Sequence, residues 1–137
     1  MSLETDRSEW PLLVVRWPEG VVTDESLDRY LAESVQDLSR RTVHCVMHDS
    51  RTAMGLSAAQ RRRMAAHLAQ HEHAIRQWTS GVAIVSPSAV IRGMITAVNW
   101  ITGTPCPQRT FATEPEARAW LRDVHRQKTH TEAPFAP

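Results

Sequence analysis

A chain of 137 residues is long enough to bury the core of one domain and too short to require a second. Its 16 lysine and arginine residues against 15 aspartate and glutamate residues leave a net charge of +1, so charge gives no support for a nucleic-acid partner. Two cysteines, Cys45 and Cys106, are too few for a disulfide scaffold, and we expect Cys45 to act as a small buried hydrophobe.

The N-terminal residues 1–9 are polar, and we expect them to be flexible. They contain acids and no apolar segment, so they do not have the pattern of a signal peptide. The longest apolar stretch, residues 89–103, is interrupted by Arg92 and Asn99 and is too short to span a membrane. We therefore expect a cytoplasmic protein without a membrane span.

The first regular element is expected directly after Pro11. Residues 12–17 are mostly of types that favour strands, and residues 18–20, Pro-Glu-Gly, have the composition of a tight turn. Val21 and Val22 can then return as a short second strand. This part of the sequence predicts a β-hairpin.

A helix is predicted over residues 23–41. Thr23 suits the N-cap, and Asp24 and Glu25 lie in the first turn, where the helix dipole favours negative charge. Apolar residues recur at helical spacing, and Arg40 and Arg41 have the sign expected at the other end. The pattern is that of an amphipathic helix packed on a sheet.

The next strand leads into the most polar stretch of the chain. Residues 43–47 are apolar apart from His44, which predicts a central strand in a covered sheet. Five polar residues follow, the last four of them in a loop that runs from Asp49 to Leu56: His48, Asp49, Ser50, Arg51 and Thr52. The end of a strand before a helix is where open α/β proteins place ligand or partner contacts, so this stretch is the first candidate site.

A long helix is predicted from Ser57 to about Thr79. Ser57 and Gln60 have the spacing of a capping box, and apolar residues continue at spacings of three and four. Three consecutive arginines lie in its first turns: Arg61, Arg62 and Arg63.

A third strand and helix follow. Residues 81–85 read as a short buried strand, and Ser86 followed by Pro87 has the pattern of an N-cap and a proline at the first helical position. The helix that they begin is expected to run to about Thr102.

The last strand and helix complete the pattern. Residues 109–112 can form an edge strand, and Thr113 with Glu116 has the spacing of a second capping box. The periodicity ends near residue 126, so we expect a disordered tail over residues 126–137.

Strands and helices thus alternate along residues 10–125. This alternation predicts a single α/β domain, with a mixed sheet of four to five strands and about four helices packed on it. Right-handed crossovers are expected wherever consecutive strands run parallel.

Three histidines form the group most similar to a metal site: His67, His71 and His73. The first two are one helical turn apart, but His73 points elsewhere, and no acidic or cysteine ligand stands nearby at a familiar spacing. We expect a structural role for these histidines and no bound metal.

The groups needed for catalysis are incomplete. His44, Asp49 and Ser50 have the residue types of a hydrolytic triad, but the nucleophile elbow G-x-S-x-G is absent. No glycine-rich phosphate loop is present either. We expect a protein that is not an enzyme and holds no cofactor.

The helix before Thr102 carries a broad apolar arc, and Trp100 lies on its other side with Gly93 and Thr96. A tryptophan beside a glycine that allows close approach predicts a contact patch for a homodimer or another protein. Packing of Trp100 beneath the C-terminal segment is the alternative.

The order of elements over residues 12–124 resembles the STAS-like group, whose best-known members are anti-sigma-factor antagonists. The chain is more specifically similar to small bacterial proteins of the STAS/SEC14-like type, in which a V-x-x-V-x-x-D-x-R-like strand end precedes an arginine-bearing helix. Here that strand end is VHCVMHDSR, residues 43–51.

In the switch-type members, a serine in a D-S-S/T-G-like loop is phosphorylated and controls partner binding. Ser50 follows Asp49 as in that loop, whereas Arg51 and Thr52 replace the small-residue pair. The resemblance therefore implies Ser50 as a phosphorylation site. Ser57 is a second candidate, because a phosphate there would lie at a helix N-terminus.

Taken together, these features predict a regulatory module that recognises a protein partner through the loop and helix of residues 49–63. The expected contact residues are Asp49, Ser50, Arg51, Thr52, Arg61 and Arg62. The SEC14-like resemblance implies an alternative, a carrier of a small apolar or lipid ligand, and an uncharacterised enzyme is the third possibility. A carrier needs a cavity, and we expect large side chains such as Met64, Met94 and Ile95 to fill the interior, because interiors are normally close-packed.

Overall fold

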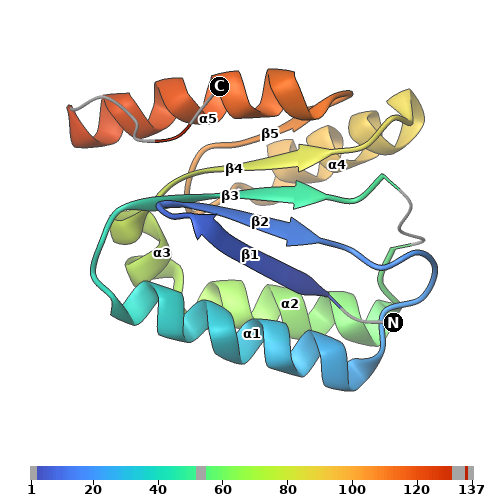
Figure 1. Ribbon diagram of the computed structural model, residues 1–137. Coiled ribbons are helices and arrows are strands. Elements are labelled where there is room, and N and C mark those ends of the chain that lie inside the picture. Colours follow the sequence, from blue (N-terminus) through green and yellow to red (C-terminus); the bar gives the residue numbers. More distant parts are fainter. Residues whose placement is uncertain (1–2, 52–54, 131–134, 136–137) are drawn as a thin grey trace.

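The computed structural model describes residues 3–51, 55–130 and 135, which form one sheet with helices on both faces (Figure 1). The elements are, in chain order, β1 (Glu4–Glu9), β2 (Leu12–Arg16), α1 (Asp24–Ser39), β3 (His44–Asp49), α2 (Ala58–Gln70), α3 (Glu72–Trp78), β4 (Thr79–Val85), α4 (Ala89–Thr102), β5 (Gln108–Phe111) and α5 (Glu114–Thr129). The predicted α/β fold with a mixed sheet is confirmed.

The strands lie in the sheet in the order in which they occur in the chain, β1-β2-β3-β4-β5. β1 is antiparallel to β2, and each later pair is parallel. Each parallel connection moves one strand across the sheet in the same direction. The helices of these right-handed crossovers, α1 to α4, therefore share one face, and α5 covers the other (Figure 1).

The N-terminal segment is a strand, so the prediction of a flexible segment over residues 1–9 is wrong for its described part. β1 pairs with β2, with Glu4 opposite Arg16 and Glu9 opposite Leu12. Its residues are all polar and lie at the edge of the sheet, which explains why no apolar alternation marked it. The predicted return of the chain at residues 21–22 is also wrong, because β1 is the hairpin partner of β2 and Val22 is buried in the core.

Two predicted helix starts are confirmed by their caps. The Thr23 hydroxyl accepts a hydrogen bond from the backbone N–H of Ser26. Ser57 and Gln60 form both bonds of a capping box. The long helix that begins there is nevertheless two helices, because the backbone of His71 leaves the helical region between α2 and α3.

The last two helices begin differently from the prediction. Ser88, and not Ser86, caps α4, and its hydroxyl accepts from the Ile91 N–H at 3.2 Å. Thr113 precedes α5, but its hydroxyl donates to the Glu116 carboxylate and caps no backbone group, so the second capping box is not formed.

The C-terminal region is more structured than predicted. α5 continues to Thr129, beyond the expected end of the domain, and Phe135 is buried against the core. The rest of the predicted tail, residues 131–134 and 136–137, lies outside the described residues.

Strand alternation divides the core between the two faces of the sheet. The face under α5 holds one large cluster of buried side chains: Leu12, Val14, Cys45, Met47, Ala83, Val85, Phe111, Ala117, Leu121 and Phe135. A Cβ on Gly81 would lie 2.7 Å from a methyl group of Val124, so this glycine allows α5 to approach β4 closely.

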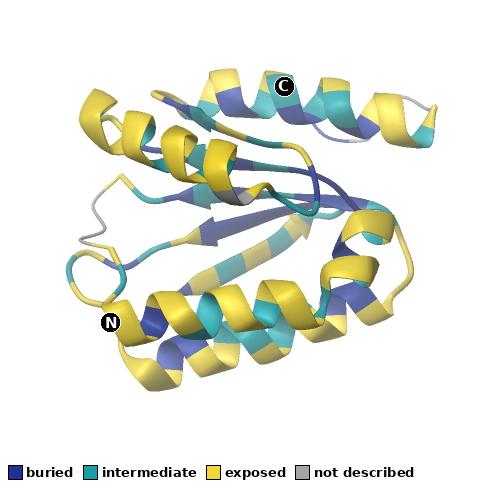
Figure 2. Cartoon of the chain, turned by 180° about the vertical axis from the view of Figure 1, so that it is seen from behind, coloured by how far each residue is buried: buried dark blue, intermediate teal, exposed yellow. Residues whose placement is uncertain are grey.

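The face under α1 to α4 is packed in two smaller clusters. One surrounds Val15 and Leu27, and the other surrounds Leu38 and Ile75. α4 stands out from this layer: Figure 2 shows it exposed along most of its length, and Val90, Met94 and Ile101 are 73%, 64% and 86% exposed. None of the described helices is both long and apolar enough to cross a membrane.

Candidate functional site

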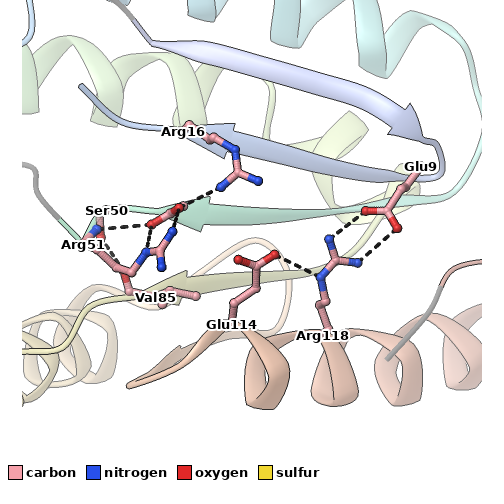
Figure 3. Close-up of polar contacts among 8 residues, drawn as sticks. Glu9, Arg16, Ser50, Arg51, Val85, Glu114 and Arg118 are labelled. Atoms are coloured by element: carbon pink, nitrogen blue, oxygen red, sulfur yellow. Dashed lines mark hydrogen bonds and ion pairs between the residues drawn. The ribbon is translucent and has the colours of Figure 1, made fainter. Parts of the chain in front are cut away.

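The polar cluster predicted from the sequence lies where β2 and β3 end (Figure 3). Arg16 and Asp49 are direct partners across the two strands, and Arg16 Nη1 donates to Asp49 Oδ2 at 2.8 Å. Arg51 donates through Nε and Nη2 to the two carboxylate oxygens of Asp49, at 2.8 and 2.7 Å. Hydrogen bonds from Arg51 hold the pKa of Asp49 below its usual value. Asp49 is thus a buried, ionised group that fixes the strand end.

The neighbouring serines are also engaged. The Ser50 hydroxyl donates to the Val85 carbonyl at 2.8 Å, which joins the ends of β3 and β4. Ser57 caps α2 with its hydroxyl. Both serines therefore have structural hydrogen bonds, and phosphorylation at either remains a prediction.

The other predicted contact residues lie either on α2 or outside the described residues. Arg61 and Arg62 are exposed on α2, and Arg61 Nη1 donates to the Leu56 carbonyl at 2.7 Å. Arg63 pairs with Asp28 of α1. Thr52 lies outside the described residues. The structure thus brings Asp49, Ser50 and Arg51 together and places the arginines of α2 on an adjoining helix.

A second ionic group, around Arg118, lies on the same side of the sheet as Arg16 and Arg51 (Figure 3). Arg118 of α5 donates to both oxygens of Glu9, at 3.2 and 2.7 Å, and to Glu114 at 3.1 Å. It joins β1 at the edge of the sheet to α5, which is a structural role that the sequence did not reveal.

The residues of the suspected hydrolytic triad do not act together. The His44 ring bonds to the Thr42 carbonyl at 2.9 Å and stacks on Trp10, while Asp49 and Ser50 make the contacts given above. His44 also lies on the opposite face of the sheet from Asp49, because the two are separated by an odd number of positions on one strand.

The histidines of α2 and α3 form no metal centre in the part of the chain that is described. The His67 and His71 rings lie 4.7 Å apart between centroids, as expected for residues one turn apart. No group of three or more histidine, cysteine, aspartate or glutamate residues suited to a metal ion occurs among the described residues.

The predicted patch on α4 is exposed. Trp100 is 85% exposed, and Gly93 and Thr96 are exposed beside it. The apolar arc opposite Trp100 is largely exposed as well, at Val90, Met94, Val98 and Ile101. The exposed apolar surface of α4 is therefore larger than the sequence indicated.

A cavity of about 650 Å³ lies on the α1–α4 face of the sheet. Its floor is the sheet, where Leu13, Val15, Trp17, His44, Val46, His48, Val82 and Ile84 face it. Its walls come from α1 to α4 and the segment before α2, through residues that include Tyr30, Ser34, Asp37, Leu38, Leu56, Met64, Leu68, Ile75, Ile91 and Ile95. We name this space the α1–α4 cavity.

This cavity corrects the expectation that large side chains fill the interior. Met64 and Ile95 line it, whereas Met94 points to solvent. The floor was hidden in the sequence because β2 and β3 are apolar on both faces, and such a pattern shows only that both faces are covered. The sequence carried one signal of this floor: a histidine stands at each end of an otherwise apolar face of β3, at His44 and His48.

The charged groups that line the cavity neutralise one another. Arg7 donates to both carboxylate oxygens of Asp37, at 2.9 and 2.8 Å, and lies 3.7 Å from Glu33. Burial lowers the pKa of both His44 and His48, for His48 to about 4, so both rings are neutral near neutral pH. The lining is thus apolar with a few neutral polar groups.

Comparison with known proteins gives a family and a fold. A family model described as SpoIIAA-like matches residues 12–122. A crystal structure from Shewanella loihica, described as an uncharacterized protein from the DUF3478 family with a SpoIIAA-like fold, is similar with a TM-score of 0.68. It is 19% identical in sequence and covers 88% of this chain and 92% of its own. A search of the curated proteins found no match.

Proposed function

The chain belongs to the SpoIIAA-like family, and from the geometry of its α1–α4 cavity we propose that it binds a small, mainly apolar molecule and catalyses no reaction of it. The observation that carries the proposal is the cavity itself, with a volume of about 650 Å³ and a mostly apolar lining. Ligand sites in proteins typically have volumes of roughly 300–1,000 Å³, apolar walls and a few polar groups that orient the ligand.

The close packing on the α5 face of the sheet makes the open space on the other face significant. Protein interiors are close-packed, and the α5 face of the same sheet follows that rule, with Leu12, Cys45, Met47 and Leu121 less than 2% exposed. A chain that packs one face of its sheet so closely can also fill the other. The open volume is therefore best explained as a site that a ligand occupies.

The polar groups around the cavity support binding rather than catalysis. Asp37 is held by Arg7, and the two histidines are neutral. General acid–base or nucleophilic chemistry needs a titratable group poised near the working pH beside a second group that activates it. The described lining residues have no such pair.

Native mass spectrometry of gently purified protein, followed by titration with the neutral apolar dye Nile red, tests the proposal. Val46 lies at the centre of the cavity floor, so Val46→Phe should fill the site and weaken dye binding at least about tenfold, which corresponds to about 1.4 kcal/mol. Val98→Phe, on the exposed side of α4, is the matched control. Equal binding by wild type and Val46→Phe, with no retained ligand in wild type, would overturn the proposal.

A second candidate function, recognition of a protein partner, is favoured by the exposed apolar surface of α4. Val90, Met94, Val98, Trp100 and Ile101 are each more than half exposed. Exposed apolar surface of this kind often marks a protein interface. Trp100→Ala should then lower the oligomeric mass measured by sedimentation, or abolish capture of a partner, and no change in either would count against it.

The strand-end surface belongs to the same candidate. Asp49 is bound by Arg16 and Arg51, so the side chains that can meet a partner near the strand end are arginines, including the exposed Arg61 and Arg62 of α2. Replacing both by glutamate should abolish binding to an acidic partner without changing thermal stability. Retained binding would exclude this surface.

A further inference from the structure

One polar group in the α1–α4 cavity has its proton position determined by its neighbour. Trp17 Nε1 lies 3.0 Å from His48 Nδ1. An indole N–H can only donate a hydrogen bond, so His48 Nδ1 must be the acceptor and carries no proton. In a neutral imidazole the proton is then on Nε2, and His48 presents an N–H donor at that atom.

The neutral state of this ring is secured by its surroundings. Burial lowers the pKa of His48 to about 4. A proton on Nδ1 would also replace the hydrogen bond from Trp17 with a clash between two donors. Over the physiological range, His48 is therefore a single tautomer.

A second donor lies beside it. The Tyr30 ring packs edge-on against His48, with 6.1 Å between the ring centroids, and both side chains line the cavity. Burial raises the pKa of Tyr30, so its hydroxyl keeps its proton. The Tyr30 hydroxyl is thus a second neutral donor among the side chains that line the cavity.

Neither donor is used within the described part of the chain. Within those residues, His48 Nε2 and the Tyr30 hydroxyl form no hydrogen bond. The fully buried side-chain atom without a partner there is instead His67 Nε2, so the two donors are reachable from the cavity or from solvent. Both donors are therefore available to a ligand in the cavity, and a ligand oxygen is the acceptor that would pair with them.

The charges around the cavity exclude an anionic group at this position. Arg7 is the only cation among the described lining residues, and it is committed to Asp37 and Glu33. A carboxylate or phosphate buried there would lack a counter-charge, which is unfavourable in an apolar site. An uncharged oxygen needs no counter-charge.

We propose that the cavity selects an uncharged, mainly hydrocarbon molecule with a carbonyl oxygen, which accepts hydrogen bonds from His48 Nε2 and the Tyr30 hydroxyl. This inference rests on the proposed ligand-binding function and adds the chemical class of the ligand. Ketones, esters and aldehydes belong to this class, and fatty acid anions do not.

The test is competition against Nile red by four ten-carbon probes: decane, decanol, methyl octyl ketone and decanoate. In wild type, the ketone should bind about tenfold more tightly than decane, because its oxygen accepts two hydrogen bonds in the cavity. Decanoate should bind more weakly than the ketone. His48→Phe should remove the preference for the ketone over decane and retain decane binding. Tyr30→Phe should remove part of that preference. His73→Phe, an exposed histidine of α3, is the matched control.

The possible failures separate the two proposals. Binding of none of the probes, nor of Nile red, would overturn the ligand-binding function. Equal affinity of wild type for decane and the ketone, or tighter binding of decanoate, would overturn the proposed ligand class and leave an apolar binder.

A measurement on the unmodified protein covers the case in which His48→Phe does not fold. Histidine-labelled ¹⁵N NMR should show the Nε2–H tautomer for His48, and its Nε2 resonance should shift on addition of the ketone and not of decane. An Nδ1–H tautomer, or identical spectra with both probes, would contradict the proposal.

Discussion

Neighbouring leucines in β2 point to opposite faces of the sheet and lie in different surroundings. Leu12 belongs to the large cluster under α5, whereas Leu13 lines the α1–α4 cavity. Both are buried, with exposures of 0% and 4%. Burial alone therefore does not distinguish a closely packed face from one that encloses a cavity.

The helices explain this difference. α5 lies across the sheet and contacts β3, β4 and β5, and Gly81 allows its close approach. On the other face, α1, α2 and α3 group together while α4 lies against the edge strand β5. The cavity lies between these two groups, with Ile91 and Ile95 of α4 on its wall. The position of α4 therefore keeps this space open.

The largest difference between the faces is expected from truncating the two leucines. Leu12→Ala should lower the free energy of unfolding by about 3–4 kcal/mol, because it opens a void in a close-packed cluster. Leu13→Ala should cost about 2 kcal/mol, because Leu13 already borders open volume and makes fewer contacts. Urea unfolding of both variants gives the comparison. Equal losses would show that the two faces are packed equally well.

Acid should weaken the cavity face through His48. Its pKa is about 4 in the folded protein and about 6.5 when unfolded, so the unfolded chain binds the proton more readily. The contribution of neutral His48 to the free energy of unfolding is then fully present above about pH 6.5. It falls by about 2–3 kcal/mol as the pH drops towards 4.

Urea unfolding at several pH values checks this dependence, with His48→Phe as the variant. The free energy of unfolding of this variant should fall less steeply than that of wild type between about pH 6.5 and pH 4. A residual slope is expected from His44 and His125, because burial lowers the pKa of each. If the free energy of unfolding fell equally steeply in wild type and in His48→Phe, His48 would not be held neutral in the folded protein.

The close approach of α5 to the sheet predicts a smaller effect at Gly81. Gly81→Ala should cost about 2 kcal/mol, because the new methyl group would lie 2.7 Å from Val124 Cγ2. Gly93→Ala is the matched control: its new methyl group meets no atom within 4 Å, and it should stabilise α4 by about 0.5–1 kcal/mol. Thermal unfolding distinguishes the two, and a neutral Gly81→Ala would show that α5 is free to shift.

The smallest effects are expected at the helix caps, one on each face. Ser57→Ala removes a complete capping box from α2 and should cost about 1 kcal/mol. Thr113→Ala should cost only a few tenths of a kcal/mol, since the hydroxyl bonds to a side chain and not to a backbone N–H. Urea unfolding measures both, and a larger loss at Thr113 would contradict this assignment.

Much of the fold was predictable because its signals are local. The caps at Thr23 and Ser57 were found because each hydroxyl bonds to a backbone N–H three residues away. β3 was found because its residues are apolar on both faces. The break at His71 was missed because the apolar periodicity continues through it.

The candidate site was predictable only in part. The sequence placed Asp49, Ser50 and Arg51 together because they are neighbours in the chain. Their role was not predictable, since Arg16, which completes the ionic group, is 33 residues away. β1 was missed for a similar reason: its polar residues form a strand because an edge of the sheet accepts their backbone hydrogen bonds.

By itself, the sequence determined β2 to β5, most of the helices, their order, and two of the caps, because these depend on residues a few positions apart. The tertiary structure alone decided the pairing of β1 with β2, the position of α4 and the volume enclosed beside it. It also decided the proton position on His48, through an indole 31 residues away. These properties depend on how distant segments pack together, and apolar periodicity contains no information about the distance at which a helix comes to rest on a sheet.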